Sequence, residues 1–385
     1  MSSRLWDFLH ARAVEIHVGD HLRERLGRGE KLRVKLGIDP TAPDIHVGHL
    51  VVLDVLRAFQ EDGHTVVLIV GDFTARIGDP SGRSETRPVL TKEQVDVNAR
   101  TYFDQASLVL RGDRIEVHGN AEWLAELDMA GVLKLLGATT LQQVLQREDF
   151  AVRLREGLAI GAHEILYPFN QAYDSVAIRA DIEIGGSDQL FNLLFGREVQ
   201  RAYGQEPQDV AVFPLLEGLD GVQRMSKSLG NYIGIAEPPE QIYGKAMSLP
   251  DTITEKYARL VCDFDPADLD RVLQLGPRDA KAAMARQLVK RLHGEEAAGR
   301  AEADFRRRFV EKELPVEVPE VIVPAGATAH EGAKLAFGLS SAQLRDAFAH
   351  GGVRANGEAA SADQQLQEGD LLQFGKHRFA RVKHG

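Results

Sequence analysis

Cysteine and long apolar runs are scarce in this chain of 385 residues. Its single cysteine, Cys262, excludes an internal disulfide and any zinc site built from several cysteines. The longest strongly apolar run, Val66 to Val70, is far too short to span a membrane. The first twenty residues carry several charges and no apolar stretch that could serve as a signal peptide. We therefore expect a soluble, cytoplasmic protein.

The common glycine-rich nucleotide motifs are also missing. The sequence contains neither GxxxxGK[ST] nor GxGxxG, which excludes a P-loop and a dinucleotide fingerprint. No repeat with a period of 20 to 50 residues is visible, which excludes a solenoid or propeller. Hydrophobic residues at 44% and charged residues at 27% are ordinary for globular proteins. The length favours two or three domains.

Positive charge is outnumbered overall but gathers towards the C-terminus. The 46 Lys and Arg against 57 Asp and Glu give a net charge of −11, which would repel a polyanion at long range. Residues 276–312 and 376–385, however, have more basic than acidic side chains. A polyanionic partner should therefore meet the C-terminal third. Charge alone favours the simpler interpretation, that these are solvated helix faces and a charged tail.

The first 230 residues show the pattern of a parallel α/β sheet. Residues 31–38 and 65–70 are expected strands, with a helix at 47–59 between them, and 181–184 is a further strand. This βαβ order predicts a Rossmann-like parallel sheet that binds ligands at the carboxyl ends of its strands. Residues 91–165 have mostly amphipathic helical patterns and predict a helical insertion.

The rest of the chain changes character twice. Residues 231–312 are expected to form an α-helical domain, and 313–330, with three prolines, a linker. Residues 331–385 predict a small α+β module, because a helical segment is followed by alternating segments split by glycine turns.

Two histidines three residues apart, His46 and His49, stand directly after an expected strand and at the start of a helix. A helix N-terminus offers unpaired N–H groups and partial positive charge, which suit a phosphate, and Gly48 allows a ligand to approach the backbone. The motif alone is weak, since residues 16–19 repeat the letters IHVG on what we expect to be a helix surface. A zinc site at these histidines lacks an obvious third ligand.

A second candidate element is the pentapeptide Arg224–Ser228, RMSKS, with glycines on both sides. The glycines permit a mobile loop, and its two cations suit the charge that builds on a departing phosphate group. In isolation, an exposed basic turn is the commoner explanation of such a segment.

Together, the two motifs resemble the "HIGH" and "KMSKS" signatures of class I aminoacyl-tRNA synthetases. Five further segments are similar to those of the bacterial tyrosyl-tRNA synthetase family: residues 35–49, 71–88, 167–175, 184–192 and the C-terminal module, which resembles an S4-type RNA-binding domain. The resemblance covers essentially the whole chain in the family's order. It implies an enzyme that joins tyrosine to ATP, releasing pyrophosphate, and then transfers the tyrosyl group to tRNA(Tyr).

The resemblance also implies roles for individual residues. Those with a catalytic role are Thr41, His46, His49, Arg224 and Lys227. Of these, His49 sits with Gly48 under the nucleoside, and the others act on the phosphates. Those that contact ATP are Gly48, Gly186, Asp188, Met225, Ser226, Arg83 and Arg87, of which the two arginines approach the phosphates or the acceptor end of the tRNA. Magnesium is expected to arrive bound to ATP, with no metal held by the protein itself.

The tyrosine pocket implied by the resemblance has eight members: Lys35, Gly37, Asp39, Asp79, Tyr167, Gln171, Asp174 and Gln189. Asp174 is the expected acceptor of the phenol hydrogen. Tyr167, Gln171 and Asp174 are spaced four and three apart, so a helix would place them on one face. At position 35 the family commonly has a tyrosine that shares the phenol; Lys35 can instead pair with Asp174 or another acid.

The remaining expectations concern partners. Residues 231–312 are expected to bind the anticodon, and Lys376, Arg378, Arg381 and Lys383 to contact tRNA. The family likeness implies a homodimer formed through the helical insertion. Two alternatives stay open: a tryptophanyl-type relative, against which Asp174 and the S4-like end argue, and a non-catalytic RNA-binding protein, against which the intact His46, His49 and Lys227 argue.

Overall fold

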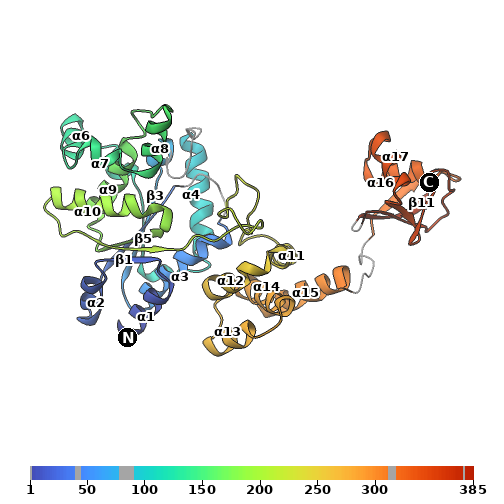
Figure 1. The fold of residues 1–385 in the computed structure, drawn as a ribbon, viewed down its shortest axis with the longest axis horizontal. Coiled ribbons are helices and arrows are strands. Elements are labelled where there is room, and N and C mark those ends of the chain that lie inside the picture. Colours follow the sequence, from blue (N-terminus) through green and yellow to red (C-terminus); the bar gives the residue numbers. More distant parts are fainter. Residues whose placement is uncertain (1, 40–44, 78–90, 311–317, 376–377) are drawn as a thin grey trace. The chain divides into compact units, whose positions relative to one another are not determined.

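The computed structural model describes residues 2–39, 45–77, 91–310, 318–375 and 378–385. The chain divides into two compact units, residues 1–302 and 303–385, which are described separately (Figure 1). No described helix is both long and apolar enough to cross a membrane.

The first unit is built on a six-stranded sheet in the order β1-β6-β5-β2-β3-β4. Its strands are β1 (Glu15–His17), β2 (Arg33–Ile38), β3 (Thr65–Val70), β4 (Ile115–Gly119), β5 (Ile182–Gly186) and β6 (Asp209–Phe213). All neighbours run parallel except β1, which is antiparallel to β6. The four central residues of β3 are buried, as expected of a strand covered on both faces. The predicted Rossmann-like sheet is confirmed.

Helices connect these strands and cover the sheet. They are α1 (Ser2–Arg12), α2 (Gly19–Gly27), α3 (Leu50–Glu61), α9 (Leu166–Ile178) and α10 (Leu190–Ala202). Figure 1 shows α9 and α10 along one side of the sheet and α1 and α3 along the other. Phe169 of α9 and Phe195 of α10 pack edge to face, with ring centroids 5.0 Å apart. Single helical turns lie at η1 (Val47–His49), η2 (Thr74–Arg76), η3 (Gly112–Arg114) and η4 (Ser187–Gln189).

The insertion contains α4 (Lys92–Ala106), α5 (Ala121–Leu124), α6 (Met129–Leu136), α7 (Leu141–Val144) and α8 (Glu148–Glu156). The expected, mostly helical insertion is present, although β4 lies within it as an edge strand with no fully buried residue. One expectation in this unit was wrong. Residues 16–19 are not a helix surface: His17 ends β1, and Val18 has a left-handed backbone with φ of 60°. Short edge strands carry little hydrophobic alternation, so their sequence signal is weak.

After residue 230 the first unit becomes helical, as predicted. Its helices are α11 (Pro239–Ser248), η5 (Asp251–Ile253), α12 (Thr254–Val261), α13 (Pro266–Leu273), α14 (Pro277–His293) and α15 (Glu295–Phe305). A buried ion pair joins this helical part to the sheet. Arg291 of α14 donates to both carboxylate oxygens of Asp54 on α3, and to the carbonyl oxygen of Val261 at 2.7 Å.

The second unit begins at residue 303 and contains the π-helical turn η6 (Arg306–Val310). It has a five-stranded sheet in the order β7-β11-β10-β8-β9, with two helices. The elements are β7 (Glu320–Val323), α16 (Ala329–Phe337), α17 (Ser341–Ala349), β8 (Val353–Ala355), β9 (Glu358–Ala359), β10 (Leu371–Phe374) and β11 (Arg378–His384). Both helices begin with capping boxes, Thr328 with Glu331 and Ser340 with Gln343. The apolar core includes Leu344 and Leu372, both fully buried.

The expected linker at 313–330 is wrong for its described residues from Glu320 onwards. β7 pairs in parallel with β11, and Thr328 caps α16, so this stretch belongs to the second unit. Prolines stand directly before and after β7. Its pairing partner, β11, lies some sixty residues later in the sequence, and a local sequence pattern cannot reveal so distant a pairing.

The Arg291–Asp54 pair leads to a prediction on stability. Both side chains are at most 7% exposed, so Arg291→Met would leave a buried carboxylate without the cation that donates hydrogen bonds to it. We expect the free energy of unfolding to fall by about 3–5 kcal/mol, measured by urea denaturation.

The matched control is Arg286→Met on the same helix, whose partners Glu295 and Glu302 are exposed. An exposed pair is worth about 0–1 kcal/mol. The double variant Asp54→Asn with Arg291→Met should recover most of the loss. Equal losses in the two single variants would contradict the structural role of the buried pair.

Candidate active site

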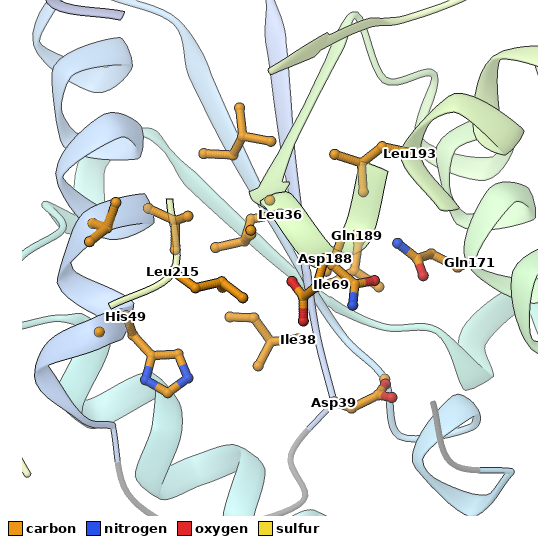
Figure 2. A pocket seen from close by; sticks show the side chains of 18 of the residues that line it. Leu36, Ile38, Asp39, His49, Ile69, Gln171, Asp188, Gln189, Leu193 and Leu215 are labelled. Atoms are coloured by element: carbon orange, nitrogen blue, oxygen red, sulfur yellow. The ribbon is translucent and has the colours of Figure 1, made fainter. Parts of the chain in front are cut away.

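A cavity of about 740 Å³ opens at the carboxyl ends of β2 and β5. Its walls come from β2, the start of α3, α9, the turn after β5 and the RMSKS segment. Figure 2 shows Asp39, Gln171, Asp188 and Gln189 around one part of it and His49 with Leu215 at another. The cavity therefore has a polar end under α9 and a second end beside α3.

His46 and His49 stand at the α3 end. Their ring centroids are 3.9 Å apart, and the backbone N–H of His46 donates to His49 Nδ1 at 3.2 Å. A Cβ on Gly48 would lie 3.0 Å from the His46 ring, so only glycine fits without a shift. Two backbone bonds tie this turn to the chain after the RMSKS segment: the Val47 N–H donates to Ile233, and the Ile235 N–H donates to Ile45. The two sequence motifs are thus one structural unit.

Burial keeps both histidines neutral. It lowers the pKa of His46 to about 2, with smaller contributions from His49 and Lys227, and that of His49 to about 4. His46 Nδ1 is buried, and it has no hydrogen-bond partner of suitable geometry among the described residues. At neutral pH these rings can offer N–H donors to a phosphate oxygen but no positive charge.

The RMSKS segment is held in place by Asn231. The Asn231 side chain accepts from the Ser226 N–H at 2.8 Å and donates to Asp220 at 2.7 Å. A Cβ on Gly218 would collide with the Asn231 side chain at 2.3 Å, so this packing requires glycine. Met225 is buried against the cavity, and its N–H donates to Leu216 at 2.7 Å.

Both cations of that segment line the cavity. The Arg224 guanidinium pairs with Asp188 Oδ2 at 2.8 Å, in the turn after β5. Lys227 Nζ lies 5.6 Å from the centre of the Tyr232 ring. A Cβ on Gly186 would approach both the Asp188 and Leu215 side chains to 2.8 Å, so a larger residue there would displace them.

The polar end is built on one face of α9. Tyr167, Gln171 and Asp174 all belong to this helix and all line the cavity, as their spacing predicted. The Tyr167 hydroxyl donates to Asp39 Oδ2 at 2.8 Å, and the Thr74 hydroxyl donates to the other oxygen at 2.8 Å. A Cβ on Gly71 would come within 2.0 Å of that oxygen.

Asp174 is buried, with 3% of its surface exposed. Trp123 Nε1 donates to Oδ1 at 2.8 Å, and Asn120 Nδ2 donates to Oδ2 at 3.2 Å. Burial nevertheless raises the pKa of Asp174 to about 7, against the opposing effects of Lys35 and these two donors. Sequence reasoning missed both donors. One signal was available, because Trp123 is one of only two tryptophans in the chain.

Lys35 is fully buried beside Asp174 but pairs with a different acid, Glu183 of β5, at 2.9 Å. The sequence analysis left two possible partners for Lys35, Asp174 or another acid. In the structure the partner is another acid, Glu183. Glu183 lines the cavity and was also missed.

The other expected site residues are distributed as follows. Gly37, Ser226 and Gln189 line the cavity, and Gln189 Oε1 accepts from Asn192 at 2.9 Å. Five lie outside the described residues: Thr41, Asp79, Arg83, Arg87 and Lys376. No three His, Cys, Asp or Glu side chains of the described chain gather as a metal site would require.

Arg378, Arg381 and Lys383 belong to β11 of the second unit. The Arg378 guanidinium covers the rings of Phe337 and Phe374, at 5.2 and 5.5 Å from their centroids. Arg381 and Lys383 are exposed and, being two residues apart, point to the other face of the strand. Lys383 pairs with Glu320 at 2.8 Å.

Comparisons with known proteins bear on the same elements. The family of class I tRNA synthetases for tryptophan and tyrosine matches residues 28–310. The tyrosine–tRNA ligase of Moorella thermoacetica is 47% identical over 94% of this chain and 90% of its own length. That of Thermotoga maritima is 45% identical over 98% and 96%.

Solved structures give the same fold. A C-terminally truncated mitochondrial tyrosyl-tRNA synthetase of Aspergillus nidulans superposes with a TM-score of 0.66 at 23% identity, covering 79% of this chain and 94% of that one. The tryptophanyl-tRNA synthetase of Plasmodium falciparum gives 0.61 at 15% identity, covering 78% and 88%. At these identities the likeness concerns the fold alone.

The raised pKa of Asp174 predicts an unusual pH dependence of stability. Between about pH 4 and 7 the folded protein holds a proton on Asp174 that the unfolded chain has lost, so stability contributed by this group falls as the pH rises. The free energy of unfolding of the parent, compared with that of Asp174→Asn, should therefore fall by on the order of 2–4 kcal/mol between about pH 4 and 7. Above about pH 7 the difference between the two proteins should stay constant.

The measurement is urea denaturation of both proteins at several pH values. Trp123→Phe removes an N–H that favours the ionised form, so in that variant the decline should continue to higher pH. Parallel stability curves for the parent and Asp174→Asn would show that Asp174 is ionised throughout.

Proposed function

The chain belongs to the class I tRNA synthetases for tryptophan and tyrosine, and we propose from its cavity that it acts as a tyrosine–tRNA ligase. One observation carries the choice of amino acid. Asp174 is a buried carboxylate at the polar end of the cavity, oriented by Trp123 and Asn120. Such a group favours a ligand that brings a hydroxyl to it and penalises one that leaves it unpaired.

The amino acid's ammonium group fits the acceptors between α9 and the end of β2. Asp39 supplies a carboxylate, and the Tyr167 hydroxyl and Gln171 amide lie beside it on the cavity wall. A cation placed there meets negative charge and hydrogen-bond acceptors together. Asp79, outside the described residues, is assigned to the same group by resemblance alone.

ATP fits the end beside α3. The nucleoside would lie over Gly48, where the backbone is open, with its ribose hydroxyls at Asp188. His46 and His49 donate N–H groups to the phosphates at the N-terminal end of α3. Thr41, Arg83 and Arg87 are assigned to the phosphates by resemblance, and Mg²⁺ arrives bound to ATP.

The first reaction step needs no covalent bond to the enzyme. A carboxylate oxygen of tyrosine attacks the α-phosphorus of ATP, and the bond from that phosphorus to the β-phosphate's bridging oxygen breaks, releasing pyrophosphate. The charge that develops on the leaving group calls for cations fixed in advance. Lys227 and Arg224 line the cavity for this purpose. Positioning and electrostatics supply the catalysis.

The second step transfers the tyrosyl group to the terminal adenosine of tRNA(Tyr). We assign tRNA binding to the helical region 231–312 and to the second unit as an S4-like RNA-binding domain. In that unit Arg381 and Lys383 present charge on one exposed face, whereas Arg378 stacks on phenylalanines. Arg378 therefore supports the fold of this unit, and Lys376 joins the tRNA contacts by resemblance.

A homodimer is supported by the surface of the insertion. Large apolar side chains are exposed there: Met129, Leu133, Leu141, Leu154 and Leu158. Met129 and Leu133 lie one turn apart on α6, so they share a face. Exposed apolar side chains gathered in one region are typical of a protein interface. As a translation enzyme, the protein is assigned to the cytoplasm.

The experiment that tests this function is amino-acid-dependent pyrophosphate exchange with tyrosine, tryptophan and phenylalanine. Tyrosine alone should support exchange at micromolar to millimolar concentrations. Exchange with tryptophan, whose indole N–H could also donate to a carboxylate, would favour the tryptophan branch of the family. Absence of exchange with all three would refute adenylate formation.

Lys227→Ala should lower kcat for exchange by on the order of a hundredfold and leave the KM for tyrosine nearly unchanged. A contact made mainly in the transition state acts on kcat. The matched control is Lys245→Ala. Lys245 contacts the same Tyr232 ring at 4.9 Å but pairs with Glu237 outside the cavity. Equal effects of the two substitutions would show that Lys227 acts only through Tyr232.

Replacing Arg381 and Lys383 by glutamine should weaken tRNA binding and flatten its salt dependence. Each lost phosphate contact reduces the slope of log K against log salt by about 0.7–0.9. Arg28→Gln serves as control, because Arg28, like Lys383, is an exposed cation paired with a glutamate. Pyrophosphate exchange should be unaffected in both proteins. An unchanged slope would remove β11 from the tRNA interface.

A further inference from the structure

Lys35 has the most enclosed cation in the cavity region, with no exposed surface. Its ammonium donates to the Gln171 carbonyl oxygen at 2.8 Å and to Ser175 Oγ at 2.8 Å, and it pairs with Glu183 Oε1 at 2.9 Å. An ammonium has three N–H donors, and these three partners use them all. Lys35 therefore cannot donate to a bound amino acid without giving up one of them.

Glu183 is equally enclosed, with 1% of its surface exposed. It stands opposite Lys35 in the register of β2 and β5. Its carboxylate accepts from Ser175 Oγ at 3.2 Å, from Gln208 Nε2, and from Gln171 Nε2 at 3.5 Å. The pair is thus neutral as a whole and satisfied on both sides, which a buried ion pair requires.

The contacts of this pair converge on the helix that carries the amino-acid pocket. Lys35 holds Gln171 and Ser175 of α9 on either side of Asp174, and Glu183 holds the amide nitrogen of Gln171. The amide oxygen is thereby turned away from Glu183. It is buried, and no described residue donates to it. Figure 2 shows the Gln171 side chain directed towards Gln189 and Asp188.

The pair also sets the charge around Asp174. The charged groups that act on it are Lys35 from β2 and Glu183 from β5; the donors Asn120 and Trp123 are neutral. Lys35 favours the ionised carboxylate more strongly than Glu183 opposes it. Without this cation, more of the buried carboxyl would be protonated at neutral pH.

We propose that the Lys35–Glu183 pair is a positioning pair for amino-acid selection: it fixes Gln171 and Ser175 on either side of Asp174, the acceptor of the tyrosine hydroxyl, and places a cation beside that carboxyl group. This rests on the proposed function. Lys35 itself does not contact the substrate, in contrast to the direct phenol contact that its place in the sequence suggested.

The test compares Lys35→Met with the double variant Lys35→Met and Glu183→Gln. The single variant leaves a buried carboxylate unpaired and is expected to be less stable; the double variant leaves no charge behind and should fold. Lys281→Met is the matched control. Lys281 is largely buried and pairs with Asp251, but both lie on α14 and η5, away from the residues that line the cavity.

In the double variant, the KM for tyrosine in pyrophosphate exchange should rise about tenfold at pH 7, while the KM for ATP stays unchanged. The preference for tyrosine over phenylalanine, as the ratio of kcat/KM values, should fall, because a neutral carboxyl tolerates a missing hydroxyl better than a carboxylate does. Raising the pH to about 8.5 should bring the KM for tyrosine back towards the parent's value, since Asp174 then ionises. Lys281→Met should resemble the parent at every pH.

Two outcomes overturn the proposal. A double variant with the parent's tyrosine KM and selectivity would show that the pair does not position the pocket. A loss that no increase in pH relieves would show that the pair acts on stability or contacts the phenol directly. Both outcomes require that the parent exchanges with tyrosine; a parent that does not would refute the proposed function instead.

Discussion

Desolvation of charge between β2, β5 and α9 is the constraint on which the rest of the site depends. Lys35, Glu183 and Asp174 are all at most 3% exposed, and a buried charge is tolerated only with partners in place. Those partners come from α9, from β5 and from the segment around α5. None of the three side chains has its hydrogen-bond and ion-pair partners until parts of the chain that are distant in sequence have packed together. The site and the fold of the first unit therefore form together.

The sequence predicted what depends on local pattern. The strands at 31–38 and 65–70, the histidines at the start of α3 and the common face of Tyr167, Gln171 and Asp174 follow from periodicity and spacing, and the structure has all of them. Sequence did not reveal β1, β4 or β7, because edge strands of three to five residues bury too little to leave an alternating pattern. It missed β6 as well, an internal strand whose five residues are all buried and therefore show no alternation. It also could not choose the partner of Lys35, because that choice is made by the pairing of β2 with β5.

The two motifs that suggested phosphate chemistry are joined more closely than their 175-residue separation indicates. Backbone bonds from residues 45 and 47 to 233 and 235 place the histidine turn beside the chain that leaves the RMSKS segment. Asn231 then fixes that segment against Asp220. The cations of the segment are therefore positioned by the same strand-like pairing that positions the histidines. Moving one motif requires these bonds to break or the other motif to move with it.

Burial acts on the two ends of the cavity with opposite sign, and this determines the pH at which the site is ready for ligands. At the α3 end it lowers the pKa values of His46 and His49 below that of an unfolded histidine, so stability is lost as the pH falls below about 6.5. At the α9 end it raises the pKa of Asp174 to about 7, so stability is lost as the pH rises towards that value. Above pH 7 neither end takes up or releases protons on unfolding. Both histidines are then neutral and Asp174 is ionised. In the proposed function, the histidines act as N–H donors to phosphate and Asp174 as the acceptor of the phenol. In this protonation state the folded protein carries an ionised carboxylate at a buried position, which lowers its stability. This loss of folding free energy explains why neutral hydrogen-bond donors and the fully paired Lys35–Glu183 ion pair surround Asp174.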